Sequence, residues 1–320
     1  MANSNSTQKS WGGQWTEDKL ECFEKYVKAY LTIMNKYRDK YKWRLFYFDG
    51  FAGSGDREKE MDMAIEETNQ TVTQLSLFDD VPPIVQERPQ YRGAAERVVL
   101  MEQKTRGFDF YYFIEKSEAN LTRLEFKLNK YETIGRKVFR PGDANSEVLN
   151  MAGYMRSHPE AKVLCLLDPY GMSVKWSTIT ALAGTGVDLW ILVPTGMIVS
   201  RLIQNNGQLR YPQKLEEFFG LPAKVIHETF YEHPTNQPIL FEGESGMIQK
   251  RKNIINEIIN LYCEQLGSLF SFVTHDPLVM RNGNGLPIFH FVCASDNKAA
   301  IKIAQSICNM IQQKKIQTSI

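Results

Sequence analysis

The stretch from residue 45 to residue 55 constrains the fold of this chain more than any other. It reads L-F-Y-F-D-G-F-A-G-S-G, an apolar and aromatic run that stops at Asp49 and passes into a turn with three glycines. A short continuous apolar run followed by turn residues is typical of a fully buried strand. The glycines let the backbone turn tightly and approach a ligand closely, because no Cβ is in the way. At the carboxyl end of the first strand of a doubly wound sheet, such a turn commonly binds a nucleotide cofactor.

The spacing of the glycines argues against two common cofactors. The turn matches neither G-x-G-x-x-G nor G-x-x-x-x-G-K-[ST], which disfavours NAD and ATP. It resembles instead the D-x-F-A-G-x-G loop of S-adenosylmethionine-dependent methyltransferases. The resemblance implies that S-adenosylmethionine is bound by Asp49, Gly50, Phe51, Ala52, Gly53 and Gly55. A turn with no ligand is the alternative.

Apolar periodicity predicts the order of the remaining elements. Helices are expected at 16–38, 93–103, 117–130, 176–182, 250–266 and 296–312, and strands at 45–49, 108–114, 138–140, 161–167 and 187–193. A hairpin is expected at 270–280 and 287–294, around the turn residues 282–285. The order predicts an α/β fold with a doubly wound, Rossmann-like methyltransferase sheet. This sheet is mostly parallel with a C-terminal antiparallel hairpin, and the fold adds an N-terminal helix and an insertion after strand 1.

The length of 320 residues is compatible with one large domain, and an apolar fraction of 43% is ample for its core. Residues 1–14 are polar and are expected to be disordered. Residues 15–320 are expected to form a single methyltransferase-like domain. Within it, 56–89 has few apolar residues and is predicted to be an insertion, and 200–250 is predicted to be a cap on the substrate side.

The composition excludes several classes of protein. A net charge of +1 gives no overall attraction to nucleic acid, so any such contact would depend on a local patch. The five cysteines lie far apart without a C-x-x-C pair, so we expect reduced core residues and no metal site. No apolar run reaches the roughly 18 residues that cross a bilayer. Because the N-terminus is also polar, unlike a signal peptide, a cytoplasmic location is expected.

Acidic residues follow the second and third predicted strands. Glu115 ends the second strand, where an acidic side chain binds ribose hydroxyls in doubly wound folds. The number of residues between Asp49 and Glu115 exceeds the usual interval between these two strand ends, so this role for Glu115 requires that an insertion lies between them. Asp143 and Ala144 follow the third strand, as in the G-D-A turn by which methyltransferases hold adenine. Asp143 is also a plausible N-cap of the next helix, and it can have both roles.

The fourth strand delivers Asp168, Pro169 and Tyr170 to the same edge of the sheet. The sequence resembles the [DNS]-P-P-[YFW] motif of methyltransferases that act on amines. In that motif an acidic or amide oxygen accepts a hydrogen bond from the target nitrogen, and the aromatic ring stacks on a flipped base. Here the second proline is missing and Tyr170 comes one position early, which leaves base stacking open. An ordinary turn after the strand is the alternative.

Trp15 precedes the predicted first helix, for which Thr16 is the expected N-cap. Its ring could pack against the helix as a hydrophobic staple. The functional alternative is a lid over an aromatic ligand such as adenine.

The insertion contains a short peptide, Gln74-Leu75-Ser76-Leu77-Phe78, that resembles the Q-L-[SD]-L-F motif by which bacterial proteins bind the sliding clamp. Extended peptides of this kind place apolar anchors in a pocket of a partner. Gln74, Leu75, Leu77 and Phe78 would be the contacts with the clamp. An amphipathic patch that folds back onto the domain is the alternative.

Four segments together resemble the bacterial three-Cys-motif partner family. They are W-T-x-x-K-L from Trp15, Y-F-D-G-F-A-G from Tyr47, D-P-Y-G from Asp168 and F-H-F-V-C-A-S from Phe289. The resemblance covers nearly the whole chain and is weakest over 56–89. It implies a methyltransferase-like fold and a functional partner, a radical-SAM-like protein that carries the three cysteines. It does not imply a substrate.

These observations predict an S-adenosylmethionine-dependent methyltransferase that needs no metal and modifies an amine, first of all of a nucleic acid base. Asp168 and Pro169 would position the amine, and proximity would supply most of the rate. A non-catalytic, cofactor-binding subunit of the radical-SAM-like protein is the main alternative. A metal-dependent nuclease would need a cluster of carboxylates, whereas the carboxylates here follow the strands one at a time.

Overall fold

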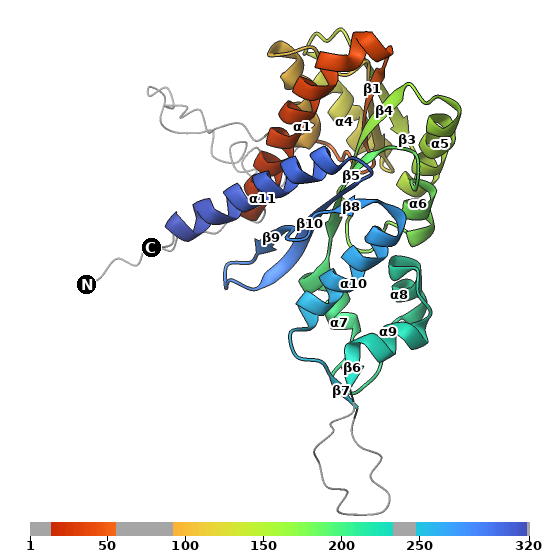
Figure 1. Cartoon of the computed structure of the whole chain (residues 1–320), viewed down its shortest axis with the longest axis vertical. Coiled ribbons are helices and arrows are strands. Elements are labelled where there is room, and N and C mark those ends of the chain that lie inside the picture. Colours follow the sequence, from red (N-terminus) through yellow and green to blue (C-terminus); the bar gives the residue numbers. More distant parts are fainter. Residues whose placement is uncertain (1–13, 56–91, 233–247, 319–320) are drawn as a thin grey trace, which may run out of the picture.

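The structure is a computed structural model of the chain, and it describes residues 14–55, 92–232 and 248–318 (Figure 1). The predicted insertion at 56–89 lies outside the described residues, and so does the clamp-like peptide at 74–78. The segment predicted to be disordered, 1–14, is described only at its last residue.

An eight-stranded sheet forms the centre of the molecule. The strand order is β3-β2-β1-β4-β5-β10-β8, and β9 also pairs with β10. The strands are β1 (Arg44–Asp49), β2 (Phe110–Glu115), β3 (Arg136–Pro141), β4 (Ala161–Leu167), β5 (Asp188–Val193), β8 (Phe272–Val273), β9 (Leu278–Arg281) and β10 (Pro287–Ser295). β1 to β5 pair in parallel, and β10 is antiparallel to β5, β8 and β9. The predicted fold class is confirmed: the sheet is doubly wound, mostly parallel and ends in an antiparallel hairpin.

The register of the strands determines which residues meet at the carboxyl edge of the sheet. Asp49, at the end of β1, is paired with Phe113 of β2 and with Leu166 of β4. Asp168 follows Leu166 by two residues and therefore lies at the same edge. From β1 the chain winds outward through β2 and β3, whereas β4 and β5 extend the sheet on the other side of β1. The β1/β4 boundary is thus a topological switch point, where open α/β sheets bind their ligands.

Helices cover both faces because successive side chains of a strand point in opposite directions. Leu45 and Tyr47 of β1 join a core cluster with residues of α1, α3, α4 and α11. Phe46 and Phe48 join the other cluster, with residues of α5, α6 and α10. The helices are α1 (Gln14–Tyr41), α3 (Ala94–Leu100) with the 3-10 turn η1 (Met101–Gln103), α4 (Glu118–Asn129), α5 (Ala144–Ser157), α6 (Trp176–Ala181), α10 (Ile254–Leu269) and α11 (Lys298–Thr318). Figure 1 shows α1 and α11 side by side on one side of the sheet, with α5 and α6 on the other.

A small lobe stands below the sheet in Figure 1. It contains the π-helical turn η2 (Thr195–Val199), α7 (Ser200–Leu202), α8 (Pro212–Phe219), α9 (Ala223–Phe230) and the two-stranded pair β6 (Tyr231–Glu232) and β7 (Gln249–Lys250). Phe218, Phe219 and Phe230 are buried in the cluster that also contains α5 and α10. The described part of the predicted cap is therefore packed on the domain core.

Several element boundaries differ from the sequence prediction, among them β8 and β9, which replace one strand predicted at 270–280, and two further differences concern functional expectations. The charged run at 250–252 does not begin a helix, because Lys250 belongs to β7 and α10 begins only at Ile254. The Lys250 Nζ donates to the carbonyl of Ser200 at 2.7 Å. The extended pairing of Lys250 with Tyr231 overrides its helical propensity. The first helix also differs from the prediction, because α1 includes Trp15, which therefore lies inside the helix and not before it.

Within the described ranges, none of the helices has both the length and the apolar character that crossing a bilayer requires.

Candidate functional site

A cavity of about 660 Å³ lies at the carboxyl edge of the sheet, where β1 and β4 end. Its walls bring together most of the site residues predicted from the sequence: Trp15, Asp49, Phe51, Ala52, Gly53, Gly55, Asp168, Pro169 and Tyr170. Its volume is within the range of about 300–1,000 Å³ that is usual for small-molecule and cofactor sites. Segments separated by more than a hundred residues of sequence therefore form one site.

The glycine turn after β1 has the backbone shape that the sequence predicts. Gly53 and Gly55 have φ angles of 61° and 78°, in the left-handed region that favours glycine. A Cβ added to Gly53 would meet no atom within 4 Å, so the turn is open at that point. The Ala52 N–H donates to the carbonyl of Ile114 at 2.9 Å, and the Gly53 N–H donates to Glu115 Oε2 at 3.1 Å. These two bonds hold the turn against the end of β2.

Asp49 is the buried carboxylate of the site, only 2% exposed. The Tyr47 hydroxyl donates to Oδ2 at 3.0 Å, and the Phe51 N–H donates to Oδ1 at 3.2 Å. Burial raises the pKa of Asp49 to about 7, because the two hydrogen bonds only partly offset the loss of solvent. A carboxylate in this state favours a cationic partner that restores its charge.

Asp168 forms an ion pair with Lys19, whose Nζ donates to Oδ2. The Lys19 side chain comes from the first turns of α1 and is 9% exposed, whereas that of Asp168 is 25% exposed. Pro169 is buried, and Tyr170 is 76% exposed. The motif after β4 thus presents one partly exposed carboxylate, held by α1, and one exposed aromatic ring.

Trp15 and Phe289 form an aromatic wall of the cavity. Their ring centroids are 5.4 Å apart with the planes tilted by 32°. Trp15 is also packed against the core cluster of α1 and α11. Trp15 thus packs on the domain from within α1 and also lines the cavity, and its role as a lid over adenine stays a prediction.

Four predicted cofactor residues do not line this cavity: Gly50, Glu115, Asp143 and Ala144. Glu115 accepts hydrogen bonds from the N–H groups of Gly53 and Ser117, so its carboxylate braces the glycine turn. Asp143 is exposed and caps α5 by accepting from the Ser146 N–H at 3.1 Å. Gly50 lies inward, because a Cβ there would be 2.7 Å from Leu167 Cδ2 and 3.7 Å from Ala144 Cβ.

The cavity also includes residues that sequence reasoning did not select, namely Lys19, Asn120, Arg123, Met197, Ile198 and Phe289. One signal for Lys19 was present: it is four residues after Trp15, so both side chains lie on the same helix face. Met197 and Ile198 belong to the π-helical turn η2, and such turns are frequent at functional sites. Sequence periodicity carries no signal for a π turn.

His290 is next to Phe289 in the chain but does not line the cavity. Its Nδ1 is 2.8 Å from Thr195 Oγ1, and burial lowers its pKa to about 4. The imidazole is therefore neutral near pH 7.

In the part of the chain that the structure places, three or more His, Cys, Asp or Glu side chains nowhere gather in a way that could hold a metal ion. The site is built from backbone groups, two carboxylates, aromatic and aliphatic side chains, and the polar side chains of Lys19, Asn120 and Arg123.

No protein-family description matches the chain, and no curated protein matches it. One solved structure that resembles it is Trm1 from Pyrococcus horikoshii in complex with S-adenosyl-L-methionine. The two are 10% identical with a TM-score of 0.38, over 91% of this chain and 58% of Trm1. The chain thus spans little more than half of the protein that it matches.

Proposed function

We propose that the protein is an S-adenosylmethionine-dependent methyltransferase whose target is an amine, in the first instance of a nucleic acid base. The observation that carries the proposal is that the glycine turn with Asp49 and the Asp168-Pro169-Tyr170 segment line one cavity. The cavity lies at the switch point of a mostly parallel sheet that ends in an antiparallel hairpin, as predicted for this class.

The residues of the cavity fit the chemistry of this cofactor. S-adenosylmethionine carries a sulfonium and an ammonium cation, and Asp49 is a buried carboxylate with no cationic hydrogen-bond partner among the described residues. The open backbone at Gly53 leaves space for close approach of a ligand. Trp15 and Phe289 supply an apolar wall for a ring system. Glu115, which braces this turn, and Asp143, the N-cap of α5, lie outside the cavity lining but stay the proposed ligands of ribose and adenine.

When bound, the cofactor supplies the methyl group. Asp168 would accept a hydrogen bond from the target amine through a carboxylate oxygen, as its partial exposure allows. Lys19 holds that carboxylate in place through Oδ2. The exposed ring of Tyr170 would pack against the molecule that carries the amine. Orientation of the amine lone pair toward the methyl carbon would then account for most of the rate acceleration.

The test is methyl transfer from isotopically labelled S-adenosylmethionine to single- and double-stranded DNA and RNA. We expect labelled product from the wild-type protein and a loss of at least about 100-fold with Asp168→Ala, the size seen when a group that stabilises the transition state is removed. Asp296→Ala serves as control, because Asp296 is a carboxylate that bonds Ser271 and does not line the cavity. Equal product from wild-type protein and Asp168→Ala would contradict the assigned role of Asp168.

The competing proposal is a non-catalytic subunit that binds the cofactor and a radical-SAM-like partner. It predicts binding of S-adenosylmethionine without turnover on any nucleic acid. It also predicts a stable complex with such a partner that survives Asp168→Ala.

A further inference from the structure

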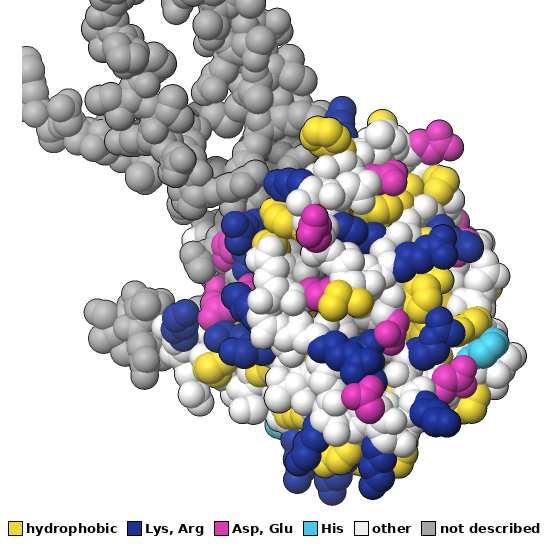
Figure 2. Space-filling model, turned by 90° about the horizontal axis from the view of Figure 1, so that it is seen from above, with side chains coloured by type: hydrophobic (Ala, Val, Ile, Leu, Met, Phe, Trp, Pro, Cys, Tyr) yellow, Lys and Arg dark blue, Asp and Glu magenta, His cyan; other side chains and the backbone are white. Residues whose placement is uncertain are grey.

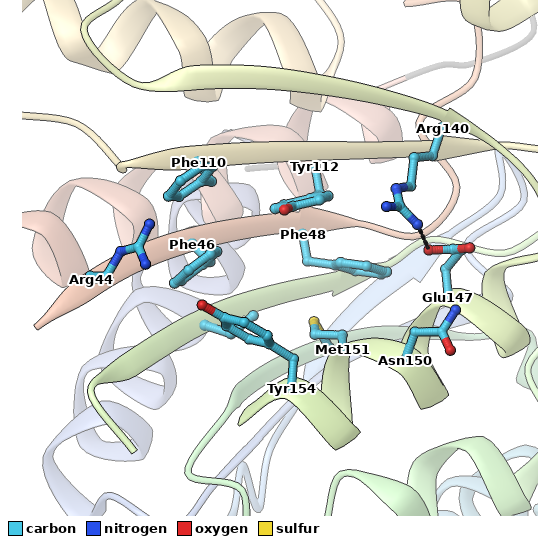
Figure 3. Close-up of a pocket in the computed structure, with 11 residues that line it drawn as sticks. Arg44, Phe46, Phe48, Phe110, Tyr112, Arg140, Glu147, Asn150, Met151 and Tyr154 are labelled. Carbon is cyan, nitrogen blue, oxygen red and sulfur yellow. Dashed lines mark hydrogen bonds and ion pairs between the residues drawn. The ribbon is translucent and has the colours of Figure 1, made fainter. Parts of the chain in front are cut away.

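A second cavity, of about 230 Å³, lies on the face of the sheet that α5 partly covers. Figure 3 shows its walls: aromatic side chains of β1 and β2 on one side, and Met151, Asn150 and Tyr154 of α5 on the other. It is separate from the site described above, since the two share no lining residue.

The sheet side of this cavity is a layer of stacked rings. Phe46 and Phe110 lie 5.1 Å apart with their planes at 10°, and Phe46 and Tyr112 lie 6.4 Å apart at 27°. Tyr154 contacts the edge of this layer, 5.8 Å from Phe46. Phe110 and Tyr112 are only half-buried, although they occupy the second strand of the central sheet. Phe110 and Tyr112 therefore keep part of their surface open to the cavity.

Arginines stand at the two ends of this cavity (Figure 3). The Arg44 guanidinium lies 4.9 Å from the centre of the Phe110 ring and 5.8 Å from that of Phe46. No carboxylate of the described residues pairs with Arg44, and its side chain is exposed. Arg140 at the other end is paired with Glu147 at 3.2 Å. Arg44 thus offers a cation without a carboxylate partner beside the aromatic layer, whereas the charge of Arg140 is neutralised by Glu147.

Several lysines are exposed in the chain segment just before Arg44. Lys36, Lys40 and Lys42 are exposed at the end of α1 that leads into β1. Seen from above (Figure 2), Lys and Arg side chains are spread over this end of the molecule, with hydrophobic side chains and some acidic ones between them. Lys36, Lys40, Lys42 and Arg44 therefore contribute positive charge near the start of β1, although Asp39 is exposed there as well.

We propose that this cavity binds one unstacked base of a single-stranded nucleic acid, with Arg44 contacting a neighbouring phosphate. The proposal deepens the proposed function, because it concerns how the same substrate class is held. Proteins bind single strands by stacking bases on aromatic rings within a basic groove, and they read the exposed base edges with polar side chains. The cavity is smaller than the roughly 300 Å³ at which drug-sized ligand sites begin, which suits a single ring system. The Asn150 amide and the Glu147 carboxylate are in position to meet its edges.

β1 contributes residues both to this cavity and to the candidate active site. The strand runs from Arg44 past Phe46 and Phe48, which line the cavity, to Asp49, which lines the other one. Five residues of strand span about 16 Å. The two cavities lie on opposite faces of the sheet, so a nucleic acid strand held at the aromatic layer would have to pass around the edge of the sheet to reach the candidate active site.

The experiment is fluorescence anisotropy of the full chain with labelled single-stranded RNA and DNA of about ten nucleotides. The variants are Tyr112→Leu, which removes one ring, and Arg44→Gln, which removes the free cation at an exposed position. Arg201→Gln is the matched control, because Arg201 is exposed on α7 and lines neither cavity. Thermal melting verifies that each variant is folded.

We expect Tyr112→Leu to weaken binding by at least about fivefold, in keeping with the loss of one stacking ring. Arg44→Gln should lower the slope of log K against log salt by about 0.7, the contribution of one phosphate contact in a single strand. Arg201→Gln should bind as the wild type does.

Three outcomes would overturn the proposal: no binding of any oligonucleotide, equal binding by wild type and both cavity variants, or mononucleotide binding as tight as oligonucleotide binding. The last would indicate a small-molecule site. Calorimetry with S-adenosylmethionine, which neither variant should affect, shows independently whether the proposed function has failed as well.

Discussion

The Lys19 ammonium donates to Oδ2 of Asp168, across 149 residues of sequence. The bond joins the start of α1 to the end of β4, and both side chains line the larger cavity. It means that the N-terminal helix, which is not part of the sheet, determines the position of the carboxylate proposed to bind the target amine.

The first prediction concerns the strength of this ion pair. Because Lys19 is almost completely buried and Asp168 is only partly exposed, removing one partner leaves the other poorly solvated. We expect Lys19→Met to lower the free energy of unfolding by about 1–3 kcal/mol. A double-mutant cycle with Asp168→Asn, measured by denaturant unfolding, should give a coupling of about 1 kcal/mol or more.

The matched control for this cycle is the ion pair between Lys224 and Glu228, in which both side chains are exposed. Exposed pairs of this kind contribute about 0–1 kcal/mol, so its coupling should be clearly smaller. A coupling at Lys19 and Asp168 no larger than that of the control would contradict the view that α1 holds the carboxylate in place.

The second prediction concerns pH and Asp49. Its pKa is raised from 3.8 to about 7 by burial, so between these values the folded protein binds a proton that the unfolded chain has released. Protonation of Asp49 in the folded protein therefore stabilises it at acidic pH, and this stabilisation is lost as the pH rises toward 7. Asp49→Asn removes it. Relative to Asp49→Asn, the wild type should lose about 2–3 kcal/mol of unfolding free energy from about pH 5 to pH 8, at about 1.4 kcal/mol per unit.

The quantity to measure is the difference between wild type and variant, because burial also raises the pKa of Asp188. Urea unfolding of both proteins across this range checks the prediction. A difference that stays constant with pH would show that Asp49 is already ionised in the folded protein at acidic pH.

The third prediction separates backbone strain from cofactor contact at Gly53. Its φ of 61° is unfavourable for alanine, but an added Cβ meets no atom within 4 Å. Gly53→Ala should therefore cost only about 1–2 kcal/mol of stability, while the new methyl group weakens cofactor binding. Gly153→Ala is the control, because Gly153 lies in α5 with open space around it and alanine there should stabilise by about 0.5–1 kcal/mol. Melting temperatures and cofactor affinities of both variants provide the test, and unchanged affinity in Gly53→Ala would place the cofactor away from the turn.

Much of the fold was predictable from the sequence because its buried strands are strongly apolar. The prediction that Asp49 and Asp168 lie at one edge followed from two such strands, since parallel neighbours end on the same side. The glycine turn was also predictable, because positive φ angles favour glycine and so mark the turn in the sequence.

The parts that were not predictable depend on how helices pack on the sheet. Lys19 belongs to the W-T-x-x-K-L segment, but the sequence does not indicate its partner, because only the packing of α1 across the sheet brings it to Asp168. Phe46, Phe110 and Tyr112 read as core, because periodicity shows which face a residue occupies but not which helix covers it. Lys250 read as the start of a helix because its partner strand is distant in sequence.

The central claim is that the cavity between the glycine turn and Asp168 binds S-adenosylmethionine. The most direct measurement is calorimetric titration of the purified protein with S-adenosylmethionine and S-adenosylhomocysteine, with Asp49→Ala as the comparison. We predict binding in the micromolar range, about −8 kcal/mol at 1 μM, and a large loss of affinity in Asp49→Ala. The absence of binding to both ligands by the folded wild-type protein would contradict the account.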